Sequence, residues 1–489
     1  MKRSVSVSCH VLHGRKDEEQ SLRYYMGSFQ VPYDSDSMEI SVSWTSLKEA
    51  QLPMILFSPD GDIRIIKASE GTVGRHLETF FLSKGKCSSG AIPGNIGRGV
   101  WKFLLYKRRF DEDLEVKVDI SLGNEIPDIG CESLSTTFDR KMVKNEPGWY
   151  EGELHVHSSE STGRTSVHEV VSTARERGLD FLAVTDHFAA SHWGKLEEEG
   201  RLYDDILLLK SMEVSGDRGH ANIHGLEEWI LPLVDDNEEI TAFLGLDERQ
   251  SMSRISHLVH DCGGLMSINH ALSGLVGWRY HDFDFRDADI FEVWCLADGV
   301  TSMMYPTMWD QLLREGVRLT GVGSSDSHDS RSEGFWKIGR IRNCVYAESL
   351  SREGILEGLR KGRCYAAIGN ARMSFYAEYE GRRYEMGDEI SYHGGKVELH
   401  IRIDADYNGN LFIYQDGNLN DVLRLLDDDR NRELTYVLES ELEEDTRSEM
   451  YVRLEFHEET VEPRFFGMAY RDHETMRLIS NPIYMVKDN

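Results

Sequence analysis

The chain has 489 residues, of which 40% are hydrophobic and 10% aromatic, and it carries a net charge of −30. This length corresponds to about three domains, each large enough to bury a hydrophobic core. The negative charge argues against a long nucleic acid as partner, because neutralising its phosphates requires a face rich in lysine and arginine.

The sequence begins MKRSVSVSCHVLHGRKDEEQ and lacks the apolar stretch of a signal peptide. No run approaches the roughly 18 consecutive apolar residues expected of a membrane-spanning helix. The seven cysteines are scattered and form no CxxC motif, which argues against a disulfide framework or a thiolate zinc site. We therefore expect a soluble cytoplasmic protein that does not act at a membrane.

The first part of the chain, residues 1–147, is expected to be rich in β-strands. The segments SMEISVSW, MILFSPDGDIRIIKAS, GVWKFLLYKRRF and LEVKVDISLG alternate apolar with polar residues and are bounded by turn residues. Short alternating segments of this kind are typical of a β-sandwich.

From residue 148 to 370, apolar strands alternate with helices. SVHEVVSTARERG begins with a capping box from Ser166 to Glu169, ends at Gly178 and is followed by the apolar run FLAV. Further helices are expected in SMSRISHLVHDCGG, MMYPTMWDQLLREG and SLSREGILEGLRKG. This alternation predicts an α/β domain with parallel strands covered by helices.

The last part, residues 371–489, returns to a β pattern in RMSFYAEYEG, KVELHIRIDAD, NLFIYQDG and MYVRLEFH. These alternating segments predict a second β-rich domain.

Histidines and carboxylates follow the apolar runs of the α/β region at His155, His157, Asp186, His187, Glu213, His270, Asp326 and His328. In an α/β barrel the carboxyl ends of the strands converge on one face, so these side chains should meet there. His-x-His on a strand points both rings to the same side. Imidazoles and carboxylates without thiolates suit Zn²⁺, Mn²⁺ or Fe²⁺.

Five motifs between residues 148 and 370 carry a resemblance to a known family. They are LHVHSS, LDFLAVTDHF, MEV with GHANIHG behind it, INHA and GSSDSHD. In order and spacing they resemble the PHP family, named for polymerase and histidinol phosphatase domains. GWYEGELHVHSS, IFEVW and GRCYAAIG are similar to its carbaryl-hydrolase-like CehA/McbA branch. The resemblance implies a distorted (β/α)7 barrel over 148–370, flanked by β-sandwich-like domains over 1–147 and 371–489.

The resemblance also implies which side chains would hold two or three divalent ions of zinc, manganese or iron, namely His155, His157, His187, Glu213, His220, His270, Asp326 and His328. The first ion would be bound by His155, His157 and Asp326. Glu213 would bridge to a second ion, which His220 and His270 would complete.

His187 and His328 would face a third ion or the leaving group, and Asp186 would orient a ligand. One position departs from the family pattern: this branch and many relatives carry an acidic residue or a histidine where Thr162 stands. Threonine is a poor ligand, so we expect two firmly bound ions and a third site that is weak or absent. Glu160 is close enough in sequence to take the place of the missing ligand.

Two cations about 3.5–4 Å apart can lower the pKa of a bridging water, and the hydroxide can attack phosphorus or a carbonyl carbon. The side chains expected to take part in catalysis are Glu213, Asp326, His187 and His328. Glu213 would set the distance between the ions, while His187 or His328 would protonate the leaving oxygen. Arg164 and Arg218 would receive phosphate oxygens; the alternative for each is a surface ion pair.

These inferences favour a metal-dependent hydrolase, with a phosphoester of a small molecule as the leading substrate class. One alternative is a carboxylic ester or carbamate hydrolase with the same metal site, since only the pocket would differ. Another is a non-catalytic metal-binding interaction module, against which the nearly complete ligand set argues. A nuclease fits the family, but the net charge argues against a long polymer.

Overall fold

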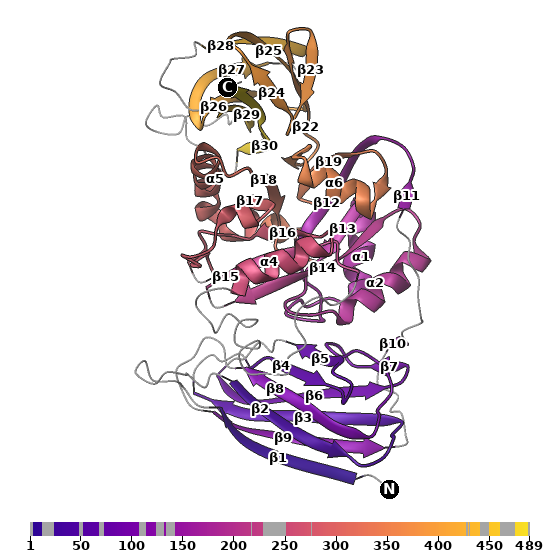
Figure 1. Ribbon diagram of the computed structural model, residues 1–489. Helices are drawn as coiled ribbons and strands as arrows, with labels where there is room; N and C mark the ends of the chain where they lie inside the picture. Colours follow the sequence, from indigo (N-terminus) through magenta and orange to yellow (C-terminus); the bar gives the residue numbers. More distant parts are fainter. Residues whose placement is uncertain are drawn as a thin grey trace.

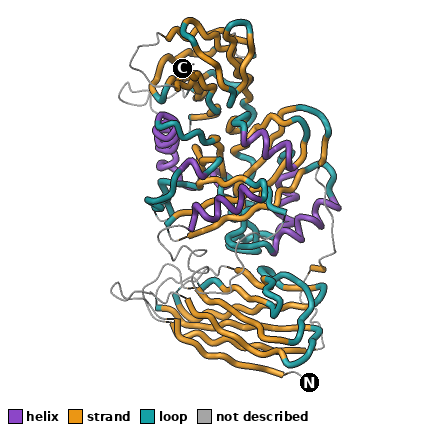
Figure 2. Tube along the Cα trace, in the orientation of Figure 1, coloured by secondary structure: helices purple, strands orange, loops and turns teal. Residues whose placement is uncertain are grey.

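The computed structural model shows a β-rich N-terminal part, a central α/β region and a β-rich C-terminal part in succession (Figure 1). The structure describes residues 3–11, 24–47, 52–67, 73–106, 114–123, 132–133, 142–216, 218–227, 251–274, 276–426, 429, 431–440, 449–459 and 475–487. The described helices all lie in the central region (Figure 2). None of these helices has the length and apolar character needed to cross a bilayer.

The N-terminal part consists of two antiparallel sheets around one core. The larger sheet has the order β1-β9-β3-β6-β7-β10 and the smaller has the order β2-β8-β4-β5. The strands are β1 (Arg3–Val11), β2 (Tyr24–Val31), β3 (Ser37–Ser46), β4 (Met54–Phe57), β5 (Ile63–Lys67), β6 (Gly74–Ser83), β7 (Lys86–Cys87), β8 (Gly99–Tyr106), β9 (Leu114–Gly123) and β10 (Glu132–Ser133). In β9 buried and more exposed residues alternate, as the sequence pattern predicts. The four strand segments expected here are confirmed.

The central region contains the helices and most of the strands of a large mixed sheet. Its elements are β11 (Met142–Lys144), β12 (Gly148–Val156), α1 (Val167–Glu176), β13 (Phe181–Val184), α2 (Ser191–Leu202), β14 (Leu207–Gly216), β15 (Gly219–His224), α4 (Ser251–Asp261), β16 (Leu265–Ile268), η1 (Phe285–Asp287), β17 (Ile290–Cys295), η2 (Leu296–Met304), α5 (Tyr305–Arg314), β18 (Thr320–Ser324), η3 (Gly334–Trp336), β19 (Ile341–Ala347), β20 (Leu350–Ser351), α6 (Arg352–Arg360) and β21 (Cys364–Ile368). The four helices expected from the sequence are present, and the capping box of α1 is formed by Ser166 and Glu169. Helix α2 was not expected, since its N-cap residue Ala190 supplies no side-chain cap.

The central strands are not all parallel, which corrects the expectation from the sequence. β12, β13 and β14 are parallel neighbours, and so are β16, β17 and β18. Between these two sets β15 runs antiparallel to both β14 and β16. The cause is the short connection from Gly216 to Gly219, because a tight turn can join only antiparallel strands.

The carboxyl ends of β12 and β18, the first and last strands of the two parallel sets, approach each other. The backbone N–H of His157, directly after β12, donates to the carbonyl oxygen of Ser327, after β18, at 2.8 Å. Val156 and Ser327 also form an isolated parallel bridge. The carboxyl ends of β12 and β18 are thereby held together, although no continuous ladder joins these two strands.

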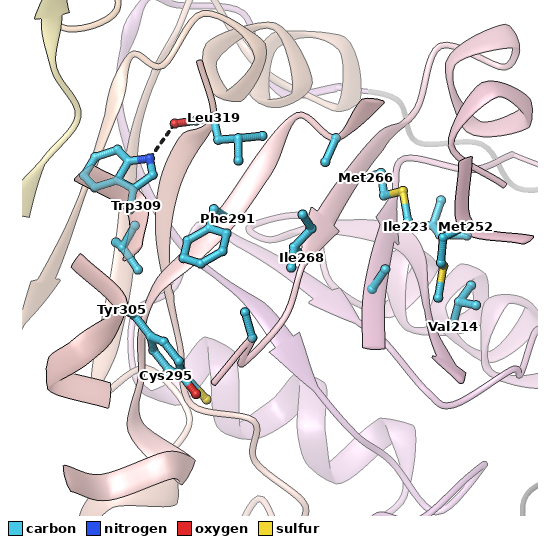
Figure 3. Packing of buried hydrophobic residues seen from close by; sticks show 14 of the residues in the cluster. Val214, Ile223, Met252, Met266, Ile268, Phe291, Cys295, Tyr305, Trp309 and Leu319 are labelled. Atoms are coloured by element: carbon cyan, nitrogen blue, oxygen red, sulfur yellow. Dashed lines mark hydrogen bonds between the residues drawn. The ribbon is translucent and has the colours of Figure 1, made fainter. Parts of the chain in front are cut away.

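Helix α5 packs on the central sheet through large apolar side chains. Trp309 and Tyr305 are fully buried and lie in one hydrophobic cluster with Phe291 of β17 (Figure 3). The indole Nε1–H of Trp309 donates to the carbonyl oxygen of Leu319 at 2.8 Å, so the one polar atom of this ring is satisfied.

The C-terminal part extends the central sheet, because β21 pairs with β30. Its strands are β22 (Arg372–Tyr379), β23 (Arg382–Glu385), β24 (Glu389–Tyr392), β25 (Gly395–Asp404), β26 (Gly409–Gln415), β27 (Asn418–Leu425), β28 (Glu433–Ser440), β29 (Glu449–Glu458), β30 (Met476–Ser480) and β31 (Ile483–Lys487). A second sheet, β23-β22-β25-β28, shares a hydrophobic core with this extension. A buried ion pair, Arg453 Nη2 to Asp310 Oδ2 at 2.6 Å, ties β29 to helix α5.

The N-terminal part is attached to the central region through a buried carboxylate. Glu160 accepts the backbone N–H of Gly90 at 2.8 Å and forms an ion pair with Lys195 of α2 at 2.7 Å. Burial alone would raise the pKa of Glu160, but Lys195 and the Gly90 N–H outweigh it and lower the pKa. The contact therefore stabilises the protein above pH 4.5, the usual pKa of this group, and is lost as the pH falls through its folded-state pKa.

We predict that Lys195→Met lowers the free energy of unfolding at neutral pH by about 3–5 kcal/mol, because Glu160 would stay buried as a charge without its cation. The difference from wild type should shrink at acidic pH, where a protonated Glu160 needs no cation. Urea unfolding at several pH values measures both effects. Lys337→Met, which removes an exposed partner of Glu333, should cost less than about 1 kcal/mol. Equal losses in the two variants would contradict the prediction.

Candidate metal centre

All eight side chains expected as ligands gather at one edge of the central sheet, where the parallel strands have their carboxyl ends and the antiparallel β15 begins. They are His155 in β12, His157 after it, His187 after β13, Glu213 in β14, His220 in β15, His270 after β16, and Asp326 and His328 after β18. These residues form four groups of three whose nitrogen or oxygen atoms all lie within 4.8 Å of one another. Positions up to 173 residues apart in the sequence are thus adjacent in space.

The His-x-His motif and Asp326 face a common point. The Nε2 atoms of His155 and His157 lie 3.2 Å apart. Asp326 Oδ1 lies 3.3 Å from His155 Nε2 and 3.0 Å from His157 Nε2. Two imidazole nitrogens and a carboxylate oxygen in this arrangement form a suitable set of ligands for one divalent ion.

Glu213 lies at the centre of the cluster, and each of its two oxygens faces histidines. Oε1 lies 3.1 Å from His220 Nδ1, 3.3 Å from His270 Nε2 and 3.5 Å from His155 Nε2. Oε2 lies 2.6 Å from His187 Nδ1. Because Glu213 contacts ring nitrogens from both proposed ligand sets, its carboxylate occupies a bridging position.

The charges of the centre favour a bound cation. Burial opposes ionisation of Glu213, but His220, His187 and His155 outweigh it and hold the pKa of this carboxyl well below its usual value. Conversely, burial alone would lower the pKa of His270, yet its hydrogen bond to Glu213 raises the pKa to about 9. The carboxylates thus favour positive charge nearby, which a divalent cation would supply.

The donor set of the centre supports the same conclusion. His157 and His270 direct Nε2 toward the other ligands, at 3.0 Å from Asp326 Oδ1 and 3.3 Å from Glu213 Oε1. Imidazole nitrogens and carboxylate oxygens without thiolates are typical ligands of zinc, manganese and iron. The residues present therefore suit divalent cations.

Glu292 of β17 is an important residue that was not identified from the sequence. Its Oε1 accepts the Nδ1–H of His155 at 2.6 Å, and its Oε2 accepts the backbone N–H of His270 at 2.7 Å. A carboxylate on the far nitrogen of a ligand histidine fixes the ring and its tautomer. A signal existed in the segment IFEVWC, where one charged residue interrupts an otherwise apolar strand.

Asp186 lies beside the ligands and contacts the loop after His157. Its Oδ1 accepts the backbone N–H of Ser158 at 2.8 Å and the hydroxyl of Ser161 at 2.6 Å. Its Oδ2 lies 3.5 Å from His192 Nδ1. The side chain thus fixes the backbone next to a ligand instead of bonding to a ligand ring.

The structure does not place Glu160 where it could replace the ligand missing at Thr162. Glu160 is engaged by Lys195 and by the backbone of Gly90 in the N-terminal part. The hydroxyl of Thr162 is buried without a hydrogen-bond partner among the described residues. Glu160 is near Thr162 in the sequence, which suggested it as a substitute ligand. Its contact with Gly90 of the N-terminal part depends on residues far away in the sequence and could not be predicted from the local segment.

The centre opens to solvent on the side of Asp326 and His328, whose side chains are 18% and 37% exposed. Arg164 is exposed, and its backbone N–H donates to the carbonyl oxygen of His328 at 2.7 Å. The guanidinium of Arg218 lies 4.6 Å from the ring centre of Tyr280. Arg218 lies two residues before His220 in the sequence, and Arg164 lies in the loop after His157.

Three of the six described non-glycine residues with positive φ lie at this centre. His270 and Asp326 have φ values of 27° and 48°, and Phe188, next to His187, has φ 44°. Non-glycine residues rarely adopt this left-handed region, and strained residues of this kind are frequent at functional sites.

Comparisons with protein-family models and with curated proteins found no match. Among solved structures, the chain is similar to a two-domain protein of Bacteroides vulgatus described as containing a predicted PHP-like metal-dependent phosphoesterase, with 16% identity over 71% of this chain and 100% of that chain and a TM-score of 0.36. It is also similar to a proposed metal-dependent phosphoesterase of Bifidobacterium adolescentis, with 17% identity, 38% and 88% coverage and a TM-score of 0.27. At these TM-scores neither similarity establishes the fold or the activity of this chain.

Proposed function

We propose that the chain is a metal-dependent phosphoesterase that hydrolyses a small phosphorylated molecule. The observation that carries the proposal is the buried carboxylate of Glu213 between two sets of ligand atoms. His155, His157 and Asp326 would hold one ion, while His220 and His270 would complete the other. The resemblance of the sequence motifs to the PHP family and to its CehA/McbA branch agrees with this assignment.

We assign two ions to the centre and leave the third position weak, because neither Thr162 nor Glu160 offers a ligand atom to it. The donor set suits zinc, manganese or iron. Divalent cations bound there would supply an activated water and would stabilise the charge that develops on the phosphoryl oxygens.

The residues of the chain would position and protonate the substrate. His328 donates its Nδ1–H to the carbonyl oxygen of Asp326 at 3.0 Å, so its Nε2 is the nitrogen left for a substrate at the exposed rim. His187 uses Nδ1 for Glu213 at 2.6 Å and is more buried. His328 is therefore the better candidate for the acid that protonates the leaving oxygen.

The position of the N-terminal part supports the proposal that the substrate is a small molecule. Ile55 and Phe57 of this part lie in one hydrophobic cluster with Phe188, the residue after His187. The hydroxyl of Ser89 donates to the carbonyl oxygen of Ser159, in the loop after the His-x-His motif. A neighbouring domain so close to the ligands restricts access, and the charge of −30 disfavours a long polyanion. Arg164 and Arg218 remain the proposed phosphate contacts.

One observation favours the second candidate function, hydrolysis of a carboxylic ester or carbamate with an aromatic leaving group. Trp278 and Tyr280 pack against Gly219, immediately before His220, and a Cβ at Gly219 would lie 3.0 Å from Trp278. Trp278 also contacts Phe283 edge to face, with ring centres 5.1 Å apart. An apolar wall beside the centre would suit an aromatic leaving group better than a small polar phosphoester.

We predict that Glu213→Gln binds two fewer divalent ions per chain than wild type, because the bridging charge is lost while the shape is kept. The measurement is the metal content after equilibrium dialysis against Mn²⁺ or Zn²⁺. Glu333→Gln, at an exposed glutamate, is the matched control and should bind as wild type does. An unchanged metal content in Glu213→Gln would refute the bridging role.

We predict that chelation abolishes the hydrolysis of p-nitrophenyl phosphate and that Mn²⁺ restores it. Asp326→Asn should lower kcat/KM by roughly 1,000-fold or more, since several kcal/mol of charge stabilisation depend on the bound ions. Parallel assays on p-nitrophenyl acetate separate the two candidate functions. Turnover of the acetate alone, again lost in Asp326→Asn, would replace the phosphoesterase by the ester hydrolase, and metal binding without turnover of either would favour a binding module.

We predict that Glu292→Gln weakens metal affinity by about 10- to 100-fold, because the amide no longer fixes and polarises the ring of His155 as a carboxylate does. Competition with a chromophoric chelator measures this affinity, and circular dichroism checks the fold. Glu292→Asp should recover part of the loss if one oxygen still reaches His155. Wild-type affinity in Glu292→Gln would show that this carboxylate does not position the ligand.

A further inference from the structure

A second cluster of histidine and carboxylate side chains lies on the outer face of the C-terminal sheet β23-β22-β25-β28. In β25, Leu399 and Ile401 are fully buried in the core, so Glu398 and His400 point to the opposite face. Register places Glu378 of β22 directly across from Glu398. Two strands thus bring side chains of metal-ligating chemistry to one place, distant in sequence from the proposed catalytic centre.

The distances around His400 fit a metal ligand with a supporting carboxylate. Its Nε2 lies 3.8 Å from Glu378 Oε2 and 4.0 Å from Glu398 Oε2, which is too far for hydrogen bonds. Atoms bound to one ion at about 2.0–2.2 Å lie roughly 3–4 Å apart, so this spacing matches a shared ion. On the other side of the ring, Nδ1 lies 3.5 Å from Glu433 Oε1. A carboxylate behind a ligand histidine is the usual outer partner of such a ring.

The imidazole itself points to a missing group. Its side chain is only 13% exposed, and both ring nitrogens are buried without a hydrogen-bond partner in the part of the chain that the structure describes. Tyr376 stacks on the ring at 4.6 Å between centres and an interplanar angle of 5°, which fixes its orientation. At least one nitrogen of a neutral imidazole is an acceptor, and leaving it buried and unused is costly.

Three carboxylates surround the ring of His400. Among the described residues no lysine or arginine forms an ion pair with the three glutamates around the ring, Glu378, Glu398 and Glu433. Arg383 lies across from Glu378 in register, but its guanidinium lies over the ring of Tyr376 at 3.6 Å and is paired with Glu385. Arg402, on the same strand as His400, is paired with Asp404. A divalent cation between the carboxylates would relieve their repulsion.

We propose that His400, Glu378 and Glu398 form a second divalent-metal site, of the type that binds Zn²⁺. One imidazole nitrogen with two carboxylate oxygens favours a borderline ion such as Zn²⁺ or Co²⁺ over Ca²⁺ or Mg²⁺, which prefer oxygen ligands alone. The ion would cross-link β22 and β25 at the surface of the C-terminal part, with Glu433 of β28 holding the ring.

The test counts Zn²⁺ ions on the full-length chain by equilibrium dialysis. His400→Ala is compared with the unchanged residue in two backgrounds, wild type and Glu213→Gln. The Glu213→Gln background removes the ions of the proposed catalytic centre from the count, so this test does not depend on the proposed function. His400→Ala should remove one ion per chain in both backgrounds. His393→Ala, at an exposed histidine of the same part, should remove none. With Co²⁺ as probe, the visible absorption of the Glu213→Gln chain should disappear on adding His400→Ala.

Glu398→Gln keeps the size of the side chain and guards against misfolding of His400→Ala. It should weaken Zn²⁺ binding at this site at least about tenfold, because a charged ligand is lost. Equal Zn²⁺ counts and equal affinities in wild type, His400→Ala and Glu398→Gln would overturn the proposal. Binding of Ca²⁺ as tight as that of Zn²⁺ would also overturn it, since the imidazole would then play no part.

Discussion

The fully buried carboxylate of Glu213 is the constraint around which the central region is arranged. A buried negative charge is stable only with positive charge and hydrogen bonds around it. Histidines from four different strand ends supply these contacts, with His187 Nδ1 at 2.6 Å and His220 Nδ1 at 3.1 Å. The same arrangement that satisfies the carboxylate presents ring nitrogens to a cation, so stability and metal binding have one physical origin.

The mixed topology of the sheet is what allows this arrangement. Because β15 turns back directly after β14, His220 lies across from Ser215 and only two pairs away from Glu213. A parallel crossover would have placed a helix between these residues. Between the ends of β12 and β18, the backbone hydrogen bond from His157 to Ser327 holds Asp326 beside the His-x-His motif. The strained φ of Asp326 is maintained by these surrounding contacts.

The parts outside the central region act on the centre mainly through position. The C-terminal strands continue the central sheet and are fixed to α5 by the buried pair of Arg453 and Asp310. The N-terminal part reaches the loop after the His-x-His motif and donates a hydrogen bond from Gly90 to Glu160, whose charge is neutralised by Lys195 of α2. Its placement removes one candidate ligand from the centre and restricts the space in which a substrate can bind.

The sequence by itself determined which residues meet, because His155, Glu213 and Asp326 sit at the ends of apolar runs whose carboxyl ends converge in an α/β fold. It also determined the four predicted helices and the strand-rich character of both flanks, since these depend on local periodicity and caps. Only the tertiary structure decided the reversed direction of β15, the support of His155 by Glu292 and the engagement of Glu160 by Lys195. These features depend on contacts between distant residues, and local patterns of apolar and polar residues do not encode which charged side chains become neighbours.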